Sequence, residues 1–266
     1  MADVDFNIQG GVARLTLNRP KVMNALAMST IREMRLALRE ISSHGDVRVL
    51  LITGAGRAFC TGADLSDPEI SLDGKLDDRA GKLAVLMRDE INPLVAEIHA
   101  LPIPRIAVVN GPAVGAGVGL ALAADIVLAG RSAYFMQVFT PRLGLVPDMG
   151  TTWHMPRLIG RARALGSAML GEKIDAARAE EWGLIWKAVD DDVLQAEAQR
   201  LADRLAAGPT AAFAALSRCL DSSYENDLIA QLAVEADVQC SLVSSADAQE
   251  AVQAFRDKRP PAFKGR

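Results

Sequence analysis

The chain has 266 residues, and 50% of them are hydrophobic, so it can bury a large core. Lys and Arg number 29 against 33 Asp and Glu, which gives a net charge of −4. This charge, and the absence of a basic run interleaved with aromatic residues, argue against nucleic acid as the main partner. The first residues lack the basic flank and apolar stretch of a secretory signal, and no apolar run reaches about 18 residues. We therefore expect a cytoplasmic protein that does not cross a membrane.

The first half of the sequence alternates between strand and helix patterns. Alternating apolar residues predict a strand at 12–17, and apolar residues at helical spacing from 31 to 41 predict a helix that starts at a capping box of Thr30 and Glu33. Further predicted elements are buried strands at 47–54, 104–111 and 125–130, with a helix at about 80–100. Strands alternating with helices indicate an α/β fold with parallel pairing.

Beyond about residue 190 the pattern contains helices alone. We therefore expect a core at 1–190 and a helical region at 191–266, in which a capping-box spacing from Ser244 to Asp247 starts a helix that runs toward Arg259. The segment 66–82 is acidic and rich in helix-breaking residues, which is typical of a mobile surface loop. An active-site lid is the functional alternative, because long loops in compact domains are often functional.

The three cysteines, Cys60, Cys219 and Cys240, are widely separated and lack CxxC spacing. An odd number without that spacing argues against both a disulfide framework and a zinc site. We expect all three to be small buried hydrophobic residues, and we expect no metal.

A glycine-rich turn joins a predicted strand to a predicted helix at 110–125, NGPAVGAGVGLALAAD. The dinucleotide fingerprint GxGxxG fails here because Leu120 stands at its final glycine, and no Lys-Ser/Thr pair follows for a P-loop. The small residues at 113–117 would let a ligand approach the N-terminus of a helix, where free N–H groups can stabilise an oxyanion. Close helix packing explains the same small residues equally well.

A second turn of this character is GRAFCTGADL, 56–65, which we expect to enter a short helix at Ala63 and Asp64, with Asp64 as its cap. Two turns that follow two parallel strands lie at the same carboxyl edge of the sheet, where open α/β folds bind ligands. One backbone donor from each loop would form an oxyanion hole.

The stretch GLVPDMG, 144–150, places Asp148 among apolar neighbours. Desolvation there would raise its pKa and make it a proton carrier near neutral pH, whereas a helix cap is the structural alternative. We interpret His154 on the following helix as a packed or surface residue, because no Ser/His/Asp order indicates a triad.

With these motifs in view, the chain resembles the crotonase (enoyl-CoA hydratase/isomerase) superfamily over about 12–264. The resemblance lies in LNRPKVMNAL, LITGAGRAFCTGADL, AVVNGPAVGAGVGLALAADIVLAG, RLGLVPDMGTTWHMPRLIGRARALG and EEWGLIWKAVD. Within the superfamily it is most similar to the ring-1,2-epoxyphenylacetyl-CoA isomerases of phenylacetate degradation. The resemblance implies a spiral of ββα turns with a C-terminal helical trimerisation region, assembled as a trimer or a hexamer.

The resemblance also implies an acyl-CoA substrate whose thioester enolate is held by the N–H groups of Ala63 and Ala116. Coenzyme A is then part of the substrate, and no separate cofactor is expected. The residues that the resemblance places along the CoA moiety are Lys21, Ala25, Ala63, Asp64 and Ala116, with Phe255 and Lys258 from an adjacent subunit.

Two departures from the family pattern bear on the chemistry. The positions of the two hydratase glutamates align to Gly119 and Thr140, which cannot transfer a proton as carboxylates do. Asp148 remains, at a position where isomerases of the family carry an aspartate. One acid that removes a proton and returns it elsewhere suits an isomerase.

We therefore expect a CoA-thioester isomerase that rearranges a 2-(1,2-epoxy-1,2-dihydrophenyl)acetyl-CoA ring epoxide or shifts a 3,4 double bond to the 2,3 position. Asp148 is its expected acid and base. The alternatives are an enoyl-CoA hydratase that uses this single carboxylate, and a non-catalytic homologue that binds acyl-CoA or RNA.

Overall fold

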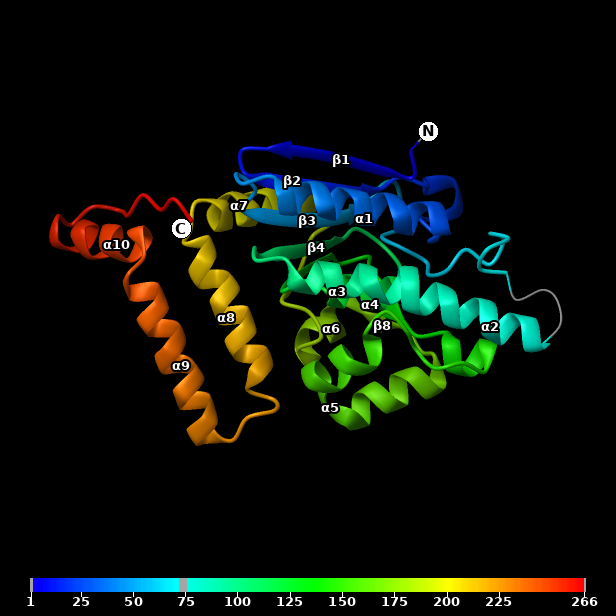
Figure 1. The fold of residues 1–266 in the computed structure, drawn as a ribbon. Helices are drawn as coiled ribbons and strands as arrows, with labels where there is room; N and C mark the ends of the chain where they lie inside the picture. Colours follow the sequence, from blue (N-terminus) through cyan, green and yellow to red (C-terminus); the bar gives the residue numbers. More distant parts are fainter. Residues whose placement is uncertain (1, 72–75, 266) are drawn as a thin grey trace.

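A six-stranded sheet of order β1-β2-β3-β4-β6-β9 runs through the computed structural model, which describes residues 2–71 and 76–265 (Figure 1). Its strands are β1 Val4–Gln9, β2 Val12–Leu17, β3 Val49–Gly54, β4 Arg105–Val109, β6 Ile126–Gly130 and β9 Lys187–Val189. β1 pairs antiparallel with β2, and all later pairings are parallel. Every residue of β3 and β4 is buried, as expected of parallel strands covered on both faces.

A second, three-stranded sheet of order β5-β7-β8 lies beyond the first. Its strands are β5 Ala113–Val114, β7 Tyr134–Met136 and β8 Ile174–Asp175. A single bridge joins Leu26, just before α1, to Ala63, and another joins Cys60 to Ala113 of β5. The turn after β3 therefore contacts the segment that follows β4 directly. The predicted α/β fold with parallel pairing is confirmed, whereas β1 was not predicted.

Helices cover both faces of the larger sheet (Figure 1). They are α1 Met28–Ser43, α2 Leu76–Leu86, α3 Asn92–Ala100, α4 Ala116–Leu122, α5 Thr151–Leu170, α6 Ala176–Trp182, α7 Leu194–Ala206, α8 Thr210–Ser222, α9 Leu228–Val243 and α10 Ala246–Arg256. The short helices are η1 Pro20–Val22, η2 Met87–Ile91 and η3 Phe139–Leu143. α7 packs against one face through Leu194 and Ala198, and α1 packs against the other through Met34 and Leu38.

The capping box predicted at Thr30 and Glu33 is wrong. α1 begins at Met28, whose N–H donates to the Asp67 carboxylate at 2.8 Å, so the cap comes from a distant part of the chain. The Glu33 carboxylate instead accepts the Val4 N–H at 2.9 Å and ties β1 to α1.

The later capping box is displaced by one residue. Ser245 is the N-cap of α10 and accepts the Ala248 N–H at 3.0 Å. Asp247 accepts N–H groups of the C-terminal tail instead, from Lys264 at 2.6 Å and Gly265 at 2.7 Å.

The segment 66–82, predicted as a loop, is in part helical. Residues 76–82 belong to α2, which continues through η2 into α3, so that part of the prediction is wrong. Glu69 is bound to α1 through an ion pair with Arg32 at 2.7 Å. Residues 72–75 lie outside the described residues, and the lid interpretation stays a prediction.

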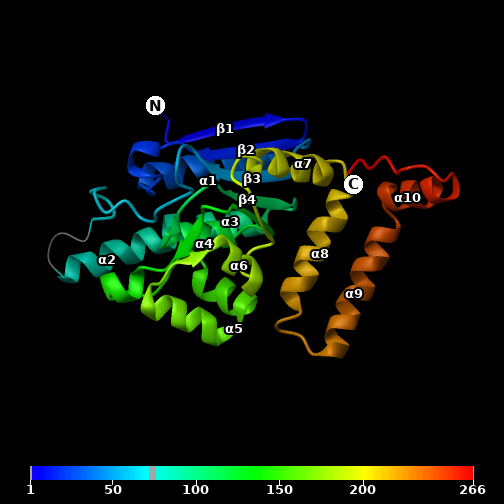
Figure 2. The ribbon, with the colours of Figure 1, turned by 180° about the vertical axis from the view of Figure 1, so that it is seen from behind.

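An arm of helices stands beside the sheet core, with α8 nearest to the core, α9 antiparallel to it and α10 at the far end (Figures 1 and 2). Ser217 on α8 binds the core by donating to Asp125 at 2.9 Å and accepting from Arg105 at 3.0 Å. α9 contains no buried residue. Among the described residues, no helix is long and apolar enough to cross a membrane.

Candidate active site

The turn after β4 delivers the N-terminus of α4 to the edge of the sheet. Gly115 adopts a left-handed φ of 55° and its N–H donates to the Met136 carbonyl at 2.9 Å, which turns the chain into α4 at Ala116. At Gly117 an added Cβ would lie 2.2 Å from the Cys60 carbonyl oxygen. Glycine is required at 117 because the two turns touch through their backbones.

The turn after β3 brings a second backbone N–H to the same place. Leu26 donates to the Gly62 carbonyl at 2.8 Å and accepts the Asp64 N–H at 2.9 Å, so these bonds fall on either side of Ala63. A Cβ added at Gly62 would lie 3.5 Å from the Ala116 nitrogen, which places the two turns side by side.

In the described part of the chain, neither the Ala63 N–H nor the Ala116 N–H donates a backbone hydrogen bond. Both residues line one cavity of about 290 Å³. Its walls are Thr61, Gly62, Ala63, Leu65, Val114, Gly115, Ala116, Met136, Val138, Phe139, Arg142 and Leu143. A largely apolar cavity lined by two residues whose N–H groups lack a backbone acceptor in the described chain is a candidate oxyanion hole.

Asp64 does not begin a helix, because residues 61–70 form turns and a bridge. Its buried carboxylate accepts the Ser66 hydroxyl at 2.5 Å and the Ser66 N–H at 3.1 Å, and it pairs with Arg19 at 2.9 Å. The Ser66 hydroxyl first and Arg19 next hold the pKa of Asp64 below its usual range. The predicted helix cap is wrong; Asp64 braces the turn that presents Ala63.

Asp148 lies in a loop with two consecutive left-handed residues, Met149 at φ 51° and Gly150 at φ 74°. Gly150 is the N-cap of α5, and the Asp148 side chain does not cap the helix, so the cap alternative is wrong. One carboxylate oxygen, Oδ1, is buried and lacks a hydrogen-bond partner among the described residues. Burial raises the pKa of Asp148 to about 6.

The loop that carries Asp148 packs against α4, the helix that begins at Ala116. A Cβ added at Gly119 would lie 2.5 Å from the Met149 Cβ and 2.6 Å from the Met149 carbonyl oxygen. Gly119 follows Ala116 by one helical turn on the same face, so the loop sits next to the oxyanion turn. The position that a hydratase glutamate would need is therefore filled by the loop that carries Asp148.

Cys60 lies in the same region. Burial first, and then the charge of Asp148, raise the pKa of its thiol to about 12, so it stays protonated. The prediction that all three cysteines are buried is confirmed for Cys60 and wrong for the other two. Cys219 on α8 is only partly buried, and Cys240 is exposed on α9, which has no buried residue.

His154 and Thr140 do not line the cavity that holds Ala63 and Ala116. Burial, reinforced by His99, lowers the pKa of His154 to about 4, and its ring packs edge-on against Trp153 at 4.8 Å. His154 is thus a packed neutral residue, as predicted. Thr140 is exposed on η3.

The predicted CoA-contacting residues fall into two groups. Ala25 lies beside the Ala63 turn, where its carbonyl accepts from Arg19 at 2.6 Å, and Lys21 is exposed on η1. Phe255, which is 85% exposed, and Lys258 lie at the end of the arm, and neither lines the cavity that holds Ala63. The apolar walls on β7 and η3 were not predicted, because only the packing of those elements brings them to the cavity.

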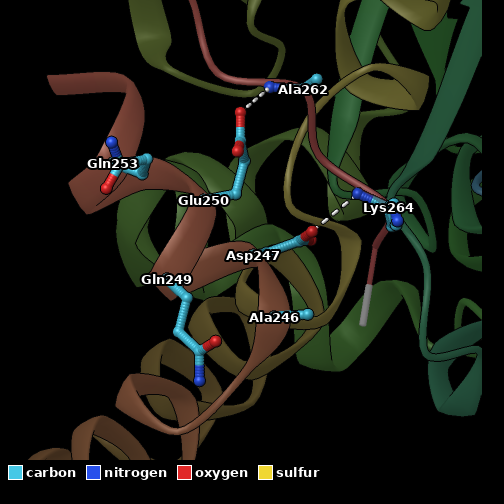
Figure 3. Close-up of a pocket in the computed structure, with 7 residues that line it drawn as sticks. All are labelled: Ala246, Asp247, Gln249, Glu250, Gln253, Ala262 and Lys264. Carbon is cyan, nitrogen blue, oxygen red and sulfur yellow. Dashed lines mark hydrogen bonds between the residues drawn. The ribbon is translucent and has the colours of Figure 1, made fainter. Parts of the chain in front are cut away.

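A larger cavity, of about 440 Å³, lies in the arm (Figure 3). Its carboxylates are already engaged, since Glu250 accepts the Ala262 N–H at 2.8 Å and Asp247 accepts the Lys264 N–H at 2.6 Å. These bonds fasten the C-terminal tail to α10. The smaller cavity is the candidate active site, because Ala63 and Ala116, whose N–H groups lack a backbone acceptor among the described residues, line it.

The chain belongs to the enoyl-CoA hydratase/isomerase family, also called the crotonase family, whose model matches residues 7–266. It is 47% identical to a probable enoyl-CoA hydratase of Rhodobacter capsulatus, over 99% of this chain and 98% of that one. It is 43% identical to the 1,2-epoxyphenylacetyl-CoA isomerase of Escherichia coli, over 98% and 97%. The crystal structure of an enoyl-CoA hydratase from Bacillus anthracis superposes with a TM-score of 0.90 at 30% identity, over 99% and 100%. The crotonase fold expected from the resemblance is confirmed.

Proposed function

We propose that the protein is an acyl-CoA isomerase in which Asp148 removes a proton from the carbon next to the thioester and returns it elsewhere on the acyl group. The observation that carries this proposal is that the loop of Asp148 occupies the place on α4 where a hydratase would carry a glutamate. Gly119 has no room for a glutamate, and the loop packed against it holds a carboxylate whose pKa burial raises to about 6. Such a group is a base in part of its population and an acid in the rest near neutral pH.

The Ala63 and Ala116 N–H groups would hold the thioester oxygen as the C–H bond breaks and the electron pair passes to the enolate. In a double-bond shift, the proton leaves C2 and the same carboxyl delivers it to C4. With a ring epoxide, the same enolate would start the rearrangement to the oxepin. The proposed mechanism uses this chain's residues and the CoA of the substrate, with no further cofactor.

The acyl group is proposed to be a 2-(1,2-epoxy-1,2-dihydrophenyl)acetyl group or a 3-enoyl group, which places the protein in phenylacetate or fatty acid metabolism. The relative that acts on epoxyphenylacetyl-CoA supports the first substrate. The cavity wall formed by Leu65, Val138, Phe139 and Leu143 offers an apolar surface to either.

Incubating the purified protein with 3-enoyl-, 2-enoyl- and ring-epoxide CoA esters tests the reaction type. Isomerisation leaves the mass unchanged and alters the ultraviolet spectrum, whereas hydration adds one water. Mass gain on crotonyl-CoA, without isomerisation of any ester, would replace the proposal by hydration.

Hydration by Asp148 alone is the second candidate, and the 47% identical relative named a probable hydratase favours it. A single carboxylate would then have to activate water and protonate carbon in the same turnover. A non-catalytic acyl-CoA or RNA-binding role would need every ester in the panel to remain unchanged while RNA binds tightly.

We also propose that the chain forms a trimer or a hexamer through its helical arm. α9 buries no residue, and Leu228 and Ile229 on it are 72% and 74% exposed. Exposed apolar patches of this kind mark interfaces. In such an assembly Phe255 and Lys258 would reach the CoA of an adjacent subunit. Light scattering after gel filtration measures the mass, and a monomer would contradict the proposal.

A further inference from the structure

Thr151 is the first residue of α5 and follows Asp148 by three positions. Its N–H donates to the Asp148 carbonyl at 2.9 Å, and the residue is only 1% exposed. Within residues 2–71 and 76–265, the Thr151 hydroxyl and the Asp148 Oδ1 are both buried, and both lack a hydrogen-bond partner. Buried polar groups without partners are few in folded proteins, so a pair in one turn requires an explanation.

The Thr151 hydroxyl faces α4, the helix that begins at Ala116. A Cβ added at Gly119 would lie 2.8 Å from the Thr151 Oγ1, on the side where it also meets Met149. Ala116 lies one helical turn earlier on the same face of α4. The Thr151 hydroxyl therefore lies where the loop of Asp148 meets α4, next to the Met149 side chain and the Met149 carbonyl oxygen.

We propose that Thr151 is a positioning residue whose hydroxyl donates a hydrogen bond to the Asp148 carboxylate, after a χ1 rotation or through one water. This inference rests on the proposed function, since it requires Asp148 to be the group that moves the proton. A donor to the charged form holds the carboxylate in one orientation and favours its ionised state. Asp148 then starts each turnover as a base in a fixed geometry.

Among the described residues, no titratable or charged group on the elements around Asp148 already donates a hydrogen bond to its buried Oδ1. α4 contributes none. The thiol of Cys60 has its pKa raised to about 12 and is uncharged, and His154, with its pKa lowered to about 4, is uncharged near neutral pH.

The remaining charged groups on the neighbouring elements form ion pairs, stack on aromatic rings, are exposed or line the cavity. α3 carries Glu97 and His99, which pair with Arg35 and Asp221. α5 also carries Arg157, which stacks on Trp153, and Arg163, which stacks on Trp182. Arg161 on the same helix is exposed. Arg142 on η3 lines the cavity, and burial rather than any charged neighbour raises the pKa of Asp148.

The test compares Thr151→Val, which keeps the shape and removes the hydroxyl, with Thr151→Ser, which keeps the hydroxyl, and with Thr152→Val as an exposed control. Isomerisation is measured as kcat/KM against pH. The acid limb is the low-pH side of this profile, where kcat/KM falls as Asp148 becomes protonated. In Thr151→Val the apparent pKa of this limb should rise by about one unit, which lowers kcat/KM about tenfold at pH values on the limb. Thr151→Ser and Thr152→Val should keep the position of the wild-type limb.

Thermal unfolding separates this role from a structural one. Thr151→Val should lower the melting temperature at pH 8, where the hydrogen bond to the ionised carboxylate is lost, and should lower it less near pH 4, where Asp148 is protonated. A purely structural role would lower it equally at both pH values. An unmoved acid limb, or an equal loss at every pH, would overturn the inference. If Asp148→Asn keeps wild-type activity, it is instead the proposed function that fails.

Discussion

The two halves of the proposed active site, an oxyanion hole and a proton-transfer group, are built from different parts of the chain. The oxyanion half consists of backbone N–H groups at Ala63 and Ala116, held where Gly62 and Gly117 allow two turns to touch. The proton-transfer half is a single side chain, Asp148, desolvated by its loop. A backbone donor does not depend on the residue that carries it. The first half is therefore broken by displacing the backbone, and the second by changing one carboxylate.

The largest effect is expected where the backbones touch. Gly117→Val would place a Cβ 2.2 Å from the Cys60 carbonyl and force the two turns apart. Losing an oxyanion donor lowers kcat by about 100- to 1,000-fold, and the overpacking costs about 1–3 kcal/mol or more in unfolding free energy. Urea unfolding and isomerase assays measure both. Gly166→Ala on α5, where an added Cβ meets nothing within 4 Å, is the control.

Next comes the contact between the two halves. Gly119→Glu should displace Met149 and Asp148, lowering isomerisation at least about 100-fold without creating hydration. Thr140→Glu, at an exposed position, should leave the fold intact. Mass analysis of crotonyl-CoA mixtures detects hydration. Efficient water addition by the Gly119→Glu variant would show that the helix accepts a glutamate, contrary to the packing at Met149.

A smaller effect is expected at the brace of the Ala63 turn. Asp64→Ala removes the acceptor for Ser66 and leaves Arg19 without this partner, so the turn should loosen. We expect kcat/KM to fall about tenfold, comparable to the loss of one charge-assisted hydrogen bond, with an unchanged acid limb. Asp5→Ala, at an exposed position on β1, is the control. A shifted acid limb would mean that Asp64 acts on proton transfer itself.

The proton-transfer half should reduce stability at neutral pH. The pKa of Asp148 is raised to about 6 in the folded chain, so the folded state binds the proton more readily than the unfolded state. The contribution of Asp148 to the free energy of unfolding should therefore rise as the pH falls from about 6 to about 4.

Asp148→Asn removes this dependence. At pH 8 the variant should be more stable by about 1–3 kcal/mol, and the difference should disappear below about pH 4. Urea unfolding at both pH values, at one protein concentration, measures it. A variant less stable at pH 8 would show that the ionised carboxylate is well satisfied in the fold.

Sequence periodicity predicted the parts of the fold in which local pattern and burial agree. The apolar runs of β3 and β4 are buried along their whole length, and they were found. β1 was missed because only Val4 in VDFNIQ is fully buried. The start of α1 was mispredicted because its cap, Asp67, lies 39 residues away and nothing local indicates it.

The candidate site likewise has features that the local sequence predicts and features that depend on tertiary packing. The apolar neighbours of Asp148 in the sequence predicted its raised pKa, and the glycines at 115 and 117 predicted a close approach to the backbone. The contact of Gly119 with Met149 and Thr151 depends on how α4 and α5 pack, which the sequence pattern does not encode. The helix expected at Ala63 was wrong because Asp64 closes a turn with Ser66.

The central claim, that Asp148 moves the proton, can be tested without knowing the natural acyl group. Deuterium uptake from D₂O into the carbon next to the thioester of phenylacetyl-CoA, followed by mass spectrometry, reports proton removal directly. The account predicts exchange by the wild type and at least about 100-fold slower exchange by Asp148→Asn, with thioester affinity retained. Equal exchange rates in the two proteins would contradict it.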